Sequence, residues 1–173
     1  AGEPAATEVR YDTVSHDGDA DAYRLRAEGH HHRPRPGHER AVHTVQLTAL
    51  APGRGYWFVA GDPVGGFSAE RAFRTIPAGD EPLRFVVGGD MGVGERAQRL
   101  QAAAAAQDPL FAVVGGDIAY ANGDWAGVDL WDRWFDNWDS LMVTAAGFNV
   151  PIVAVIGNHE VAGGYGGTPA DAA

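Results

Sequence analysis

Three apolar runs that each end in glycine and a polar residue are the feature that most constrains the fold of this chain. Leu83–Asp90 and Leu110–Asp117 both finish in Gly-Gly-Asp, and Pro151–Glu160 finishes in Gly-Asn-His-Glu. Short apolar runs rich in β-branched residues are typical of strands buried on both faces of a parallel sheet. We therefore expect Ile152–Ile156 to be such a strand, followed by a turn at Gly157.

Two helix-like segments separate the three runs. Glu95–Gln107 is rich in strong helix formers and ends at Asp108-Pro109. Asp124–Ala146 carries apolar residues at helical spacing, which predicts one broad face packed against the sheet rather than a ligand-binding surface. The residues of this face are Leu130, Trp131, Trp134, Phe135, Trp138, Leu141 and Met142. The alternating order predicts a parallel sheet with right-handed crossovers.

Polar side chains follow each of the three predicted strands. These are Asp90 after the first strand, Asp117 and Tyr120 after the second, and Asn158 and His159 after the third. Open parallel sheets bind ligands outside the carboxyl ends of their strands, so we expect the five side chains to form one site. Oxygen donors of this kind suit hard metal ions. A single Gly-Asp is common turn chemistry, so the prediction depends on the three strand ends together.

Residues 1–76 have a different pattern, that of an all-β domain. Short alternating segments are separated by turn-forming residues. These segments are Thr7–Tyr11, Ala22–Ala27, Val42–Thr48, Tyr56–Gly61 and Ala69–Thr75. The spacing of Leu50, Pro52 and Tyr56 resembles the tyrosine corner of Greek-key sandwiches, which gives Tyr56 a structural role. A partial fibronectin type III-like β-sandwich is the best match, with one or two N-terminal strands expected to be missing.

Two further segments, residues 77–82 and the histidine-rich segment 30–38, are interpreted as connections. Residues 77–82, with proline, glycine and acidic residues, predict a linker between a domain at 1–76 and a domain at 83–173. His30–His32 together with His38 could form a metal site, but their setting favours an exposed loop between strands.

Composition excludes several classes of protein. The formal net charge of −10 argues against nucleic-acid binding, which requires neutralisation of phosphates by basic residues. The absence of cysteine excludes disulfides, zinc–thiolate sites and cysteine nucleophiles. No apolar run approaches the ~20 residues of a membrane span, and the first residues do not have the pattern of a signal peptide.

The motifs GGDMG, GGDIAY and GNHE, in this order, resemble the metallophosphoesterase (calcineurin-like phosphoesterase) superfamily, and within it the purple acid phosphatase family. The superfamily usually has histidine two residues after the first aspartate, where this chain has Gly92. It usually has aspartate three residues after the second, where this chain has Tyr120. A fibronectin-like domain before the catalytic domain belongs to the same family pattern. The resemblance implies that residues 83–173 are the N-terminal half of a metallophosphoesterase α/β domain.

The resemblance also implies a role for each residue in the hydrolysis of phosphate monoesters. Asp90 and Tyr120 would bind Fe(III), Asp117 would bridge two metals, and Asn158 would bind a second, divalent ion (Zn, Fe or Mn). His159 would orient the phosphate or protonate the leaving alkoxide. The two cations would activate water and neutralise the developing charge. A secreted or periplasmic location is implied by the family alone.

The chain departs from the family pattern in its histidines. The other metal ligands of the family are histidines from later motifs, and His159 is the only histidine after residue 83. We therefore expect a chain truncated at both ends that carries part of the site and is inactive, or nearly so, alone. Alternatives are a phosphodiesterase or nucleotidase of the same superfamily, a non-catalytic β-sandwich binding module with a degenerate α/β partner, and a structural fragment. Glu160 is expected to cap or to form a salt bridge. The sequence leaves open whether the chain forms a homodimer.

Overall fold

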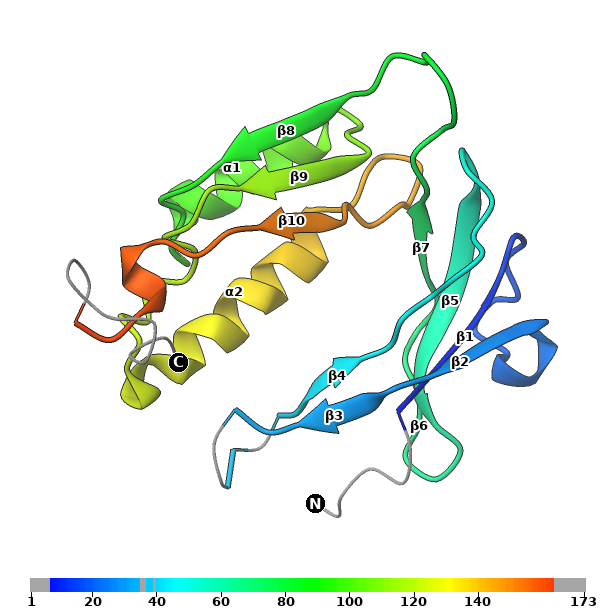
Figure 1. Ribbon diagram of the computed structural model, residues 1–173, viewed down its shortest axis with the longest axis horizontal. Helices are drawn as coiled ribbons and strands as arrows, with labels where there is room; N and C mark the ends of the chain where they lie inside the picture. Colours follow the sequence, from blue (N-terminus) through cyan, green and yellow to red (C-terminus); the bar gives the residue numbers. More distant parts are fainter. Residues whose placement is uncertain (1–6, 35–36, 39, 164–173) are drawn as a thin grey trace. The chain divides into compact units, whose positions relative to one another are not determined.

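The computed structural model describes residues 7–34, 37–38 and 40–163 (Figure 1). The chain divides into two compact units, Ala1–Glu81 and Pro82–Ala173, and the division falls at the end of the expected 77–82 linker. Neither α-helix in the described residues combines the length and the hydrophobicity that crossing a membrane would require.

The first unit consists of antiparallel strands. A five-stranded sheet has the order β2-β1-β5-β6, with β7 also paired to β5. Its strands are β1 (Glu8–Asp12), β2 (Leu25–Glu28), β5 (Gly55–Asp62), β6 (Gly66–Phe67) and β7 (Arg71–Arg74). A separate pair is formed by β3 (His30–His32) and β4 (Val42–Thr44), and a short 3-10 turn, η1 (Ala20–Ala22), precedes β2. The prediction of an all-β first half is confirmed for the described residues.

Tyr56 has the structural role that the sequence predicts. Its side chain is buried, and its hydroxyl oxygen accepts a hydrogen bond of 2.9 Å from the backbone N–H of Ala51. Its ring stacks on Phe73 at a centroid distance of 5.7 Å. The hydroxyl thus satisfies a backbone donor just before β5 while the ring packs on the sheet.

The expectation that His30–His32 lies in a loop is wrong, although His30 and His32 are exposed as expected. These residues form β3, and His31 lies opposite His43 of β4. Backbone pairing does not require apolar side chains, so a polar run can form a strand where a partner lies alongside. Gly29 allows this approach, since a Cβ there would lie 1.9 Å from the carbonyl oxygen of Thr44. The Nδ1 atoms of His31 and His43 both lie within hydrogen-bond distance of the Thr7 hydroxyl, at 3.3 and 3.1 Å.

The second unit alternates strands and helices as predicted. Its elements are β8 (Phe85–Gly88), α1 (Glu95–Ala105), β9 (Phe111–Val114), η2 (Trp125–Gly127), α2 (Val128–Leu141), β10 (Ile152–Ala154) and η3 (Asn158–Glu160). The strands form a parallel sheet in the order β8-β9-β10. The second helix lies within the segment Asp124–Ala146 that was predicted to hold it, and it ends at Leu141, where the chain turns back and forms a bridge between Val143 and Asn149.

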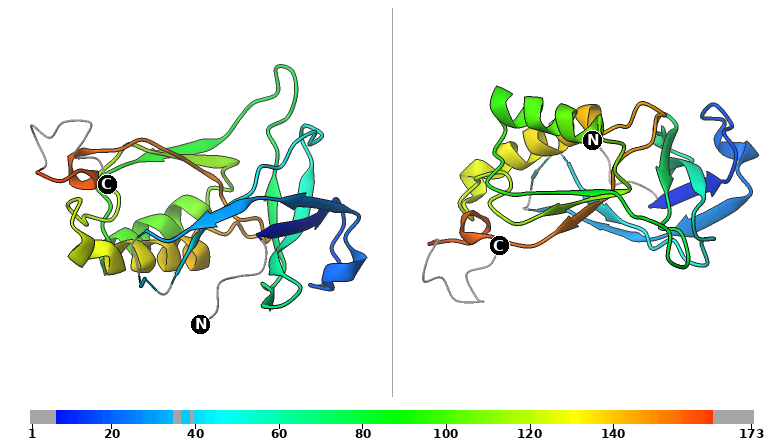
Figure 2. Two further views of the ribbon diagram at one scale, coloured as in Figure 1. Left: turned by 60° about the horizontal axis from the view of Figure 1, so that its bottom comes forward. Right: turned by 90° about the horizontal axis from the view of Figure 1, so that it is seen from above.

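Both helices cover the same face of the sheet (Figure 2). On that face Trp134, Trp138 and Met142 pack against apolar residues of the three strands, and all three are buried. The indole N–H of Trp138 donates to the carbonyl of Val150 at 3.0 Å. The prediction that the aromatic residues of α2 pack in the core is confirmed, except that Phe135 is 51% exposed.

The expectation that the strands are buried on both faces is wrong. Val153 and Val155 are 53% and 56% exposed, and Val87 and Ile156 are each 70% exposed. The sheet is extended in one direction, from β8 to β9 to β10, so both connecting helices lie on one face. In the described part of this unit no element covers the opposite face.

Candidate metal centre

The loops that follow β8 and β9 run side by side at the carboxyl end of the sheet. The backbone N–H of Asp90 donates to the carbonyl of Gly116 at 3.2 Å, and that of Gly92 donates to Ile118 at 2.8 Å. These bonds continue the pairing of the strands beyond their ends. The two predicted acidic residues, Asp90 and Asp117, are therefore held on adjacent loops.

Two glycines allow the loop after β10 to approach the loop after β9. Gly116 has a φ of +90°, and a Cβ on it would lie 2.6 Å from the backbone nitrogen of Gly157. A Cβ on Gly157 would lie 2.2 Å from Oδ1 of Asp117. Both distances are far below normal van der Waals contact, so only glycine fits at either position.

Glu160 joins the same two loops through its carboxylate. Its Oε2 accepts hydrogen bonds from the backbone N–H groups of Asp117 (2.8 Å) and Gly157 (2.6 Å), and its Oε1 accepts one from Ile118 (2.8 Å). The side chain is buried. The capping role expected for Glu160 is confirmed, and the residue acts as a positioning residue for the predicted ligands.

The predicted site residues are linked by direct contacts. The Tyr120 hydroxyl donates to Oδ1 of Asp90 at 2.9 Å, and its ring lies 4.3 Å from the imidazole of His159, centroid to centroid. The backbone N–H of His159 donates to Oδ1 of Asp117 at 3.0 Å. The structure therefore brings Asp90, Asp117, Tyr120 and His159 together. Asn158 directly precedes His159 in η3 and is half-buried, and its side chain takes part in none of these contacts.

Sequence reasoning missed Asn122. Its side-chain oxygen contacts Nδ1 of His159 and so orients the imidazole. The only signal in the sequence was Asn122-Gly123, which indicates a turn and not a partner for a histidine 37 residues further on.

The acidic surroundings perturb Tyr120. The hydrogen bond to the Asp90 carboxylate, partial burial, and the nearby charges of Asp117 and Glu160 all raise the pKa of the Tyr120 phenol. The Asp90 and Asp117 carboxylates and the Tyr120 phenol form a set of oxygen donors, and the nearby Glu160 carboxylate adds to the excess negative charge. This donor set fits a hard cation, which would replace the phenol proton between Tyr120 and Asp90.

The backbone of the site is in an uncommon conformation. Asp90, Asp117, Tyr120 and Asn122 have φ values of 51°, 50°, 61° and 58°, and they are four of the seven non-glycine residues with positive φ in the described residues. Aspartate and asparagine tolerate this region, whereas tyrosine rarely adopts it. Such conformations cluster at functional sites, where surrounding contacts maintain them.

Gly92 lies beside Tyr120. It occupies the position at which the superfamily that the sequence resembles usually has histidine. Its φ is +67°, and a Cβ there would be 3.8 Å from Cδ2 of the Tyr120 ring. The tyrosine ring thus borders the space that a longer side chain at position 92 would enter.

No protein-family model matches the chain, and no curated protein has a significantly similar sequence.

Proposed function

We propose that the second unit contributes to a dinuclear metal centre that hydrolyses phosphate monoesters, with Fe(III) and a divalent ion such as Zn, Fe or Mn. The observation that carries this proposal is the chain of contacts from Asp90 through Tyr120 and His159 to Asp117, at the carboxyl ends of parallel strands. Ligand sites of open parallel sheets lie at this edge.

The pair formed by Asp90 and Tyr120 supports a shared cation. Their oxygens are 2.9 Å apart. In an octahedral site with metal–oxygen bonds of about 2.0–2.1 Å, neighbouring ligand oxygens are about 2.9 Å apart. Little rearrangement is needed for a cation to take the place of the phenol proton, and hard Fe(III) suits a carboxylate and a phenolate.

Asp117 and Asn158 would serve the second ion. The backbone N–H of His159 donates to one oxygen of Asp117 and thereby orients the carboxylate, which would bridge the two ions. Asn158 would offer its amide oxygen. The bound cations would polarise the phosphate and neutralise charge as the ester bond breaks.

His159 would hold or donate a proton at the substrate. Asn122 engages its Nδ1, so Nε2 is the nitrogen that remains for a phosphate oxygen or the leaving alkoxide. The ring packs against Tyr120, which fixes it beside the proposed Fe(III) ligand. An imidazole suits this task near neutral pH.

The first unit would be a fibronectin type III-like β-sandwich that accompanies the catalytic domain. The antiparallel sheet, the separate β3–β4 pair and the Tyr56 hydrogen bond support this proposal.

A titration with Fe(III) tests the metal centre without relying on activity. The chain should develop a visible absorption band of the tyrosinate-to-iron type, and Tyr120→Phe should abolish it. Tyr11→Phe, which alters a buried tyrosine of the first unit, is the matched control and should retain the band. A band that persists in Tyr120→Phe, or no iron in a holoenzyme that contains this chain, would contradict the assignment.

Activity distinguishes the two hydrolytic alternatives. A loaded holoenzyme that contains this chain should hydrolyse para-nitrophenyl phosphate in preference to bis(para-nitrophenyl) phosphate. The reverse preference would favour a phosphodiesterase.

A further inference from the structure

Two histidines of the first unit lie directly opposite each other on neighbouring strands. His31 of β3 is paired with His43 of β4 in the antiparallel register of this strand pair (Figure 1). Residues opposed in this way have side chains on the same face, with Cβ atoms about 4.5–5.5 Å apart. The two imidazole centroids are 5.5 Å apart, and the ring planes are inclined by 31°.

Both imidazoles direct one nitrogen toward the same atom. Nδ1 of His31 lies 3.3 Å and Nδ1 of His43 lies 3.1 Å from the hydroxyl oxygen of Thr7. Thr7 is buried, and its carbonyl accepts a hydrogen bond of 2.9 Å from the backbone N–H of Gly29, next to the start of β3. The backbone therefore fixes the point on which the two nitrogens converge.

The hydroxyl satisfies both nitrogens in only one pattern of protons. A hydroxyl has one hydrogen to donate, so it donates to one Nδ1 and accepts from the other, which must carry a proton. A neutral imidazole can carry its proton on Nε2 instead of Nδ1. When both rings do so, two nitrogen lone pairs face one another beside Thr7, and an ion can take the place of the hydroxyl hydrogen bonds.

We infer that His31 and His43 bind one divalent transition-metal ion through their Nδ1 atoms. With zinc–nitrogen bonds of about 2.0–2.1 Å and a tetrahedral angle, the centroids of two imidazoles on one ion are about 5.2 Å apart. The observed separation of 5.5 Å is close to this value, so little movement of the strands is needed. Water fills the remaining positions of a four-coordinate ion.

The donor atoms select the class of ion. Imidazole nitrogen suits Zn, Cu and Ni, whereas Mg and Ca prefer oxygen ligands. The site differs in this respect from the candidate metal centre of the second unit, where Asp90 and Tyr120 offer oxygen. The ion lies between two side chains of one strand pair, so the site does not depend on whether further chain packs against that pair.

A zinc titration followed by NMR tests the site directly. Long-range proton–nitrogen spectra of the isotope-labelled chain resolve the two nitrogens of each imidazole. At a pH of about 7.5 an ordinary imidazole is mostly neutral and can act as a ligand. Zn(II) should shift the Nδ1 signals of His31 and His43 together, with a Kd of about 100 μM or tighter. Mg(II) at the same concentration should leave both signals unchanged.

Single substitutions identify the ligands. Loss of a group that merely supports a metal ligand costs 10–100-fold in affinity, so His31→Gln and His43→Gln should each weaken zinc binding by at least about 10-fold. His30→Gln is the matched control, because His30 is exposed and precedes His31 on β3, so its side chain points to the opposite face. It should bind zinc as the unsubstituted chain does. Far-UV circular dichroism checks the folding of each variant, and the paired shift in the unsubstituted chain does not depend on any of them.

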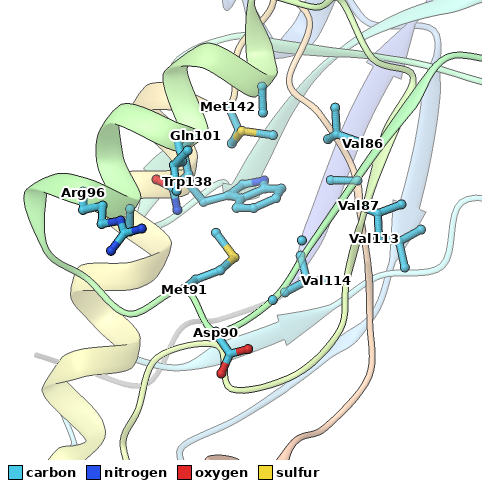
Figure 3. Close-up of a pocket in the computed structure, with 16 residues that line it drawn as sticks. Val86, Val87, Asp90, Met91, Arg96, Gln101, Val113, Val114, Trp138 and Met142 are labelled. Carbon is cyan, nitrogen blue, oxygen red and sulfur yellow. The ribbon is translucent and has the colours of Figure 1, made fainter.

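The second unit requires its own control, because zinc can also reach its carboxylates. Figure 3 shows Asp90 at one end of a cavity in the second unit, which Met91 and Arg96 also line. Asp90 is exposed. Asp90→Asn should leave the zinc response of His31 and His43 unchanged, so failure of the candidate metal centre and failure of this site are distinguishable.

Three results would overturn the inference. The first is that zinc up to about 1 mM, the weak end of specific affinity, shifts neither Nδ1 signal or only one of them. The second is that His31→Gln or His43→Gln folds and binds zinc with full affinity. The third is that sedimentation shows a zinc-dependent dimer that His43→Gln abolishes, which would assign the ion to a contact between two copies.

Discussion

Glu160→Gln is the substitution that most directly tests how the proposed metal centre is held together. In the native chain one carboxylate accepts three backbone hydrogen bonds from two loops. A glutamine keeps one acceptor oxygen and places an NH₂ group where the other oxygen was. In the better orientation its oxygen still serves Asp117 and Gly157, and the N–H of Ile118 loses its acceptor.

The magnitude follows from these three bonds. A buried N–H without an acceptor costs about 1–3 kcal/mol. The two remaining bonds change from charge-assisted to neutral, a loss of about 1 kcal/mol each. The free energy of unfolding of the second unit should therefore fall by about 3–5 kcal/mol. With a urea m value of about 2 kcal/mol/M, the midpoint of unfolding should move down by about 1.5–2.5 M.

Tryptophan fluorescence in urea is the suitable assay, because four of the five tryptophans lie in the second unit. Glu95→Gln is the matched control. Glu95 is 88% exposed and pairs with Arg99 at 3.7 Å, so its loss should change stability by less than about 0.5 kcal/mol. Hydrogen exchange should accelerate at the amide of Ile118 in Glu160→Gln alone. If Glu160→Gln abolished iron binding without changing stability or exchange, Glu160 would be a ligand and the reasoning would be refuted.

Three further predictions concern the packing and charges of the two units. Trp134→Ala should lower the free energy of unfolding of the second unit by about 3–5 kcal/mol, because removing a side chain that is 1% exposed leaves a cavity in the core. Thermal unfolding followed by circular dichroism would measure this change, and a loss below about 1 kcal/mol would contradict it. Tyr56→Phe should cost the first unit about 1–2 kcal/mol in urea unfolding followed by NMR, since the N–H of Ala51 loses its acceptor, and an unchanged midpoint would refute that role. The Arg24 guanidinium donates two hydrogen bonds of 2.9 Å to Asp12 and lowers the pKa of this buried carboxyl well below its unfolded value of about 3.9. The stabilisation that the ionised Asp12 provides should be complete above that pH and should be lost as the pH falls toward the folded pKa. Acid titrations followed by NMR should show this pH dependence in the unsubstituted chain and not in Asp12→Asn.

The strands and helices of the second unit could be predicted from sequence because each has a strong local signal. Each apolar run stops at glycine, and α1 begins at Glu95 as expected. The burial of the strands could not be predicted, because it depends on the direction in which the sheet is extended. Val153 lies on the face without helices and is exposed, but its local sequence is the same as that of a strand in a sheet covered on both faces. The position at which α2 ends could not be predicted, because the helix stops at Leu141, six residues before Gly147, the helix-breaking residue of the turn that Thr144 and Phe148 close.

The gathering of the predicted ligands follows from parallel strands ending at one edge, so sequence could place Asp90, Asp117 and His159 near one another. The left-handed backbone at Tyr120 and the contact between Asn122 and His159 could not be predicted from the sequence. Both depend on how the loops pack on one another after the strands end. The strand formed by His30–His32 was missed for a similar reason, since its partner β4 and not its own composition defines it.

The contact between Gly116 and Gly157 has an evolutionary consequence. In the proposed centre, another oxygen or nitrogen donor at Asn158 would leave the Gly116–Gly157 contact untouched, so a single substitution there would change the preference for one ion over another. The separation of the two loops cannot change in the same way, because even a methyl group at position 116 or 157 would overlap main-chain or carboxylate atoms. In the proposed centre, variation would therefore be free to alter which ion is preferred, while the distance between the two loops stays constant.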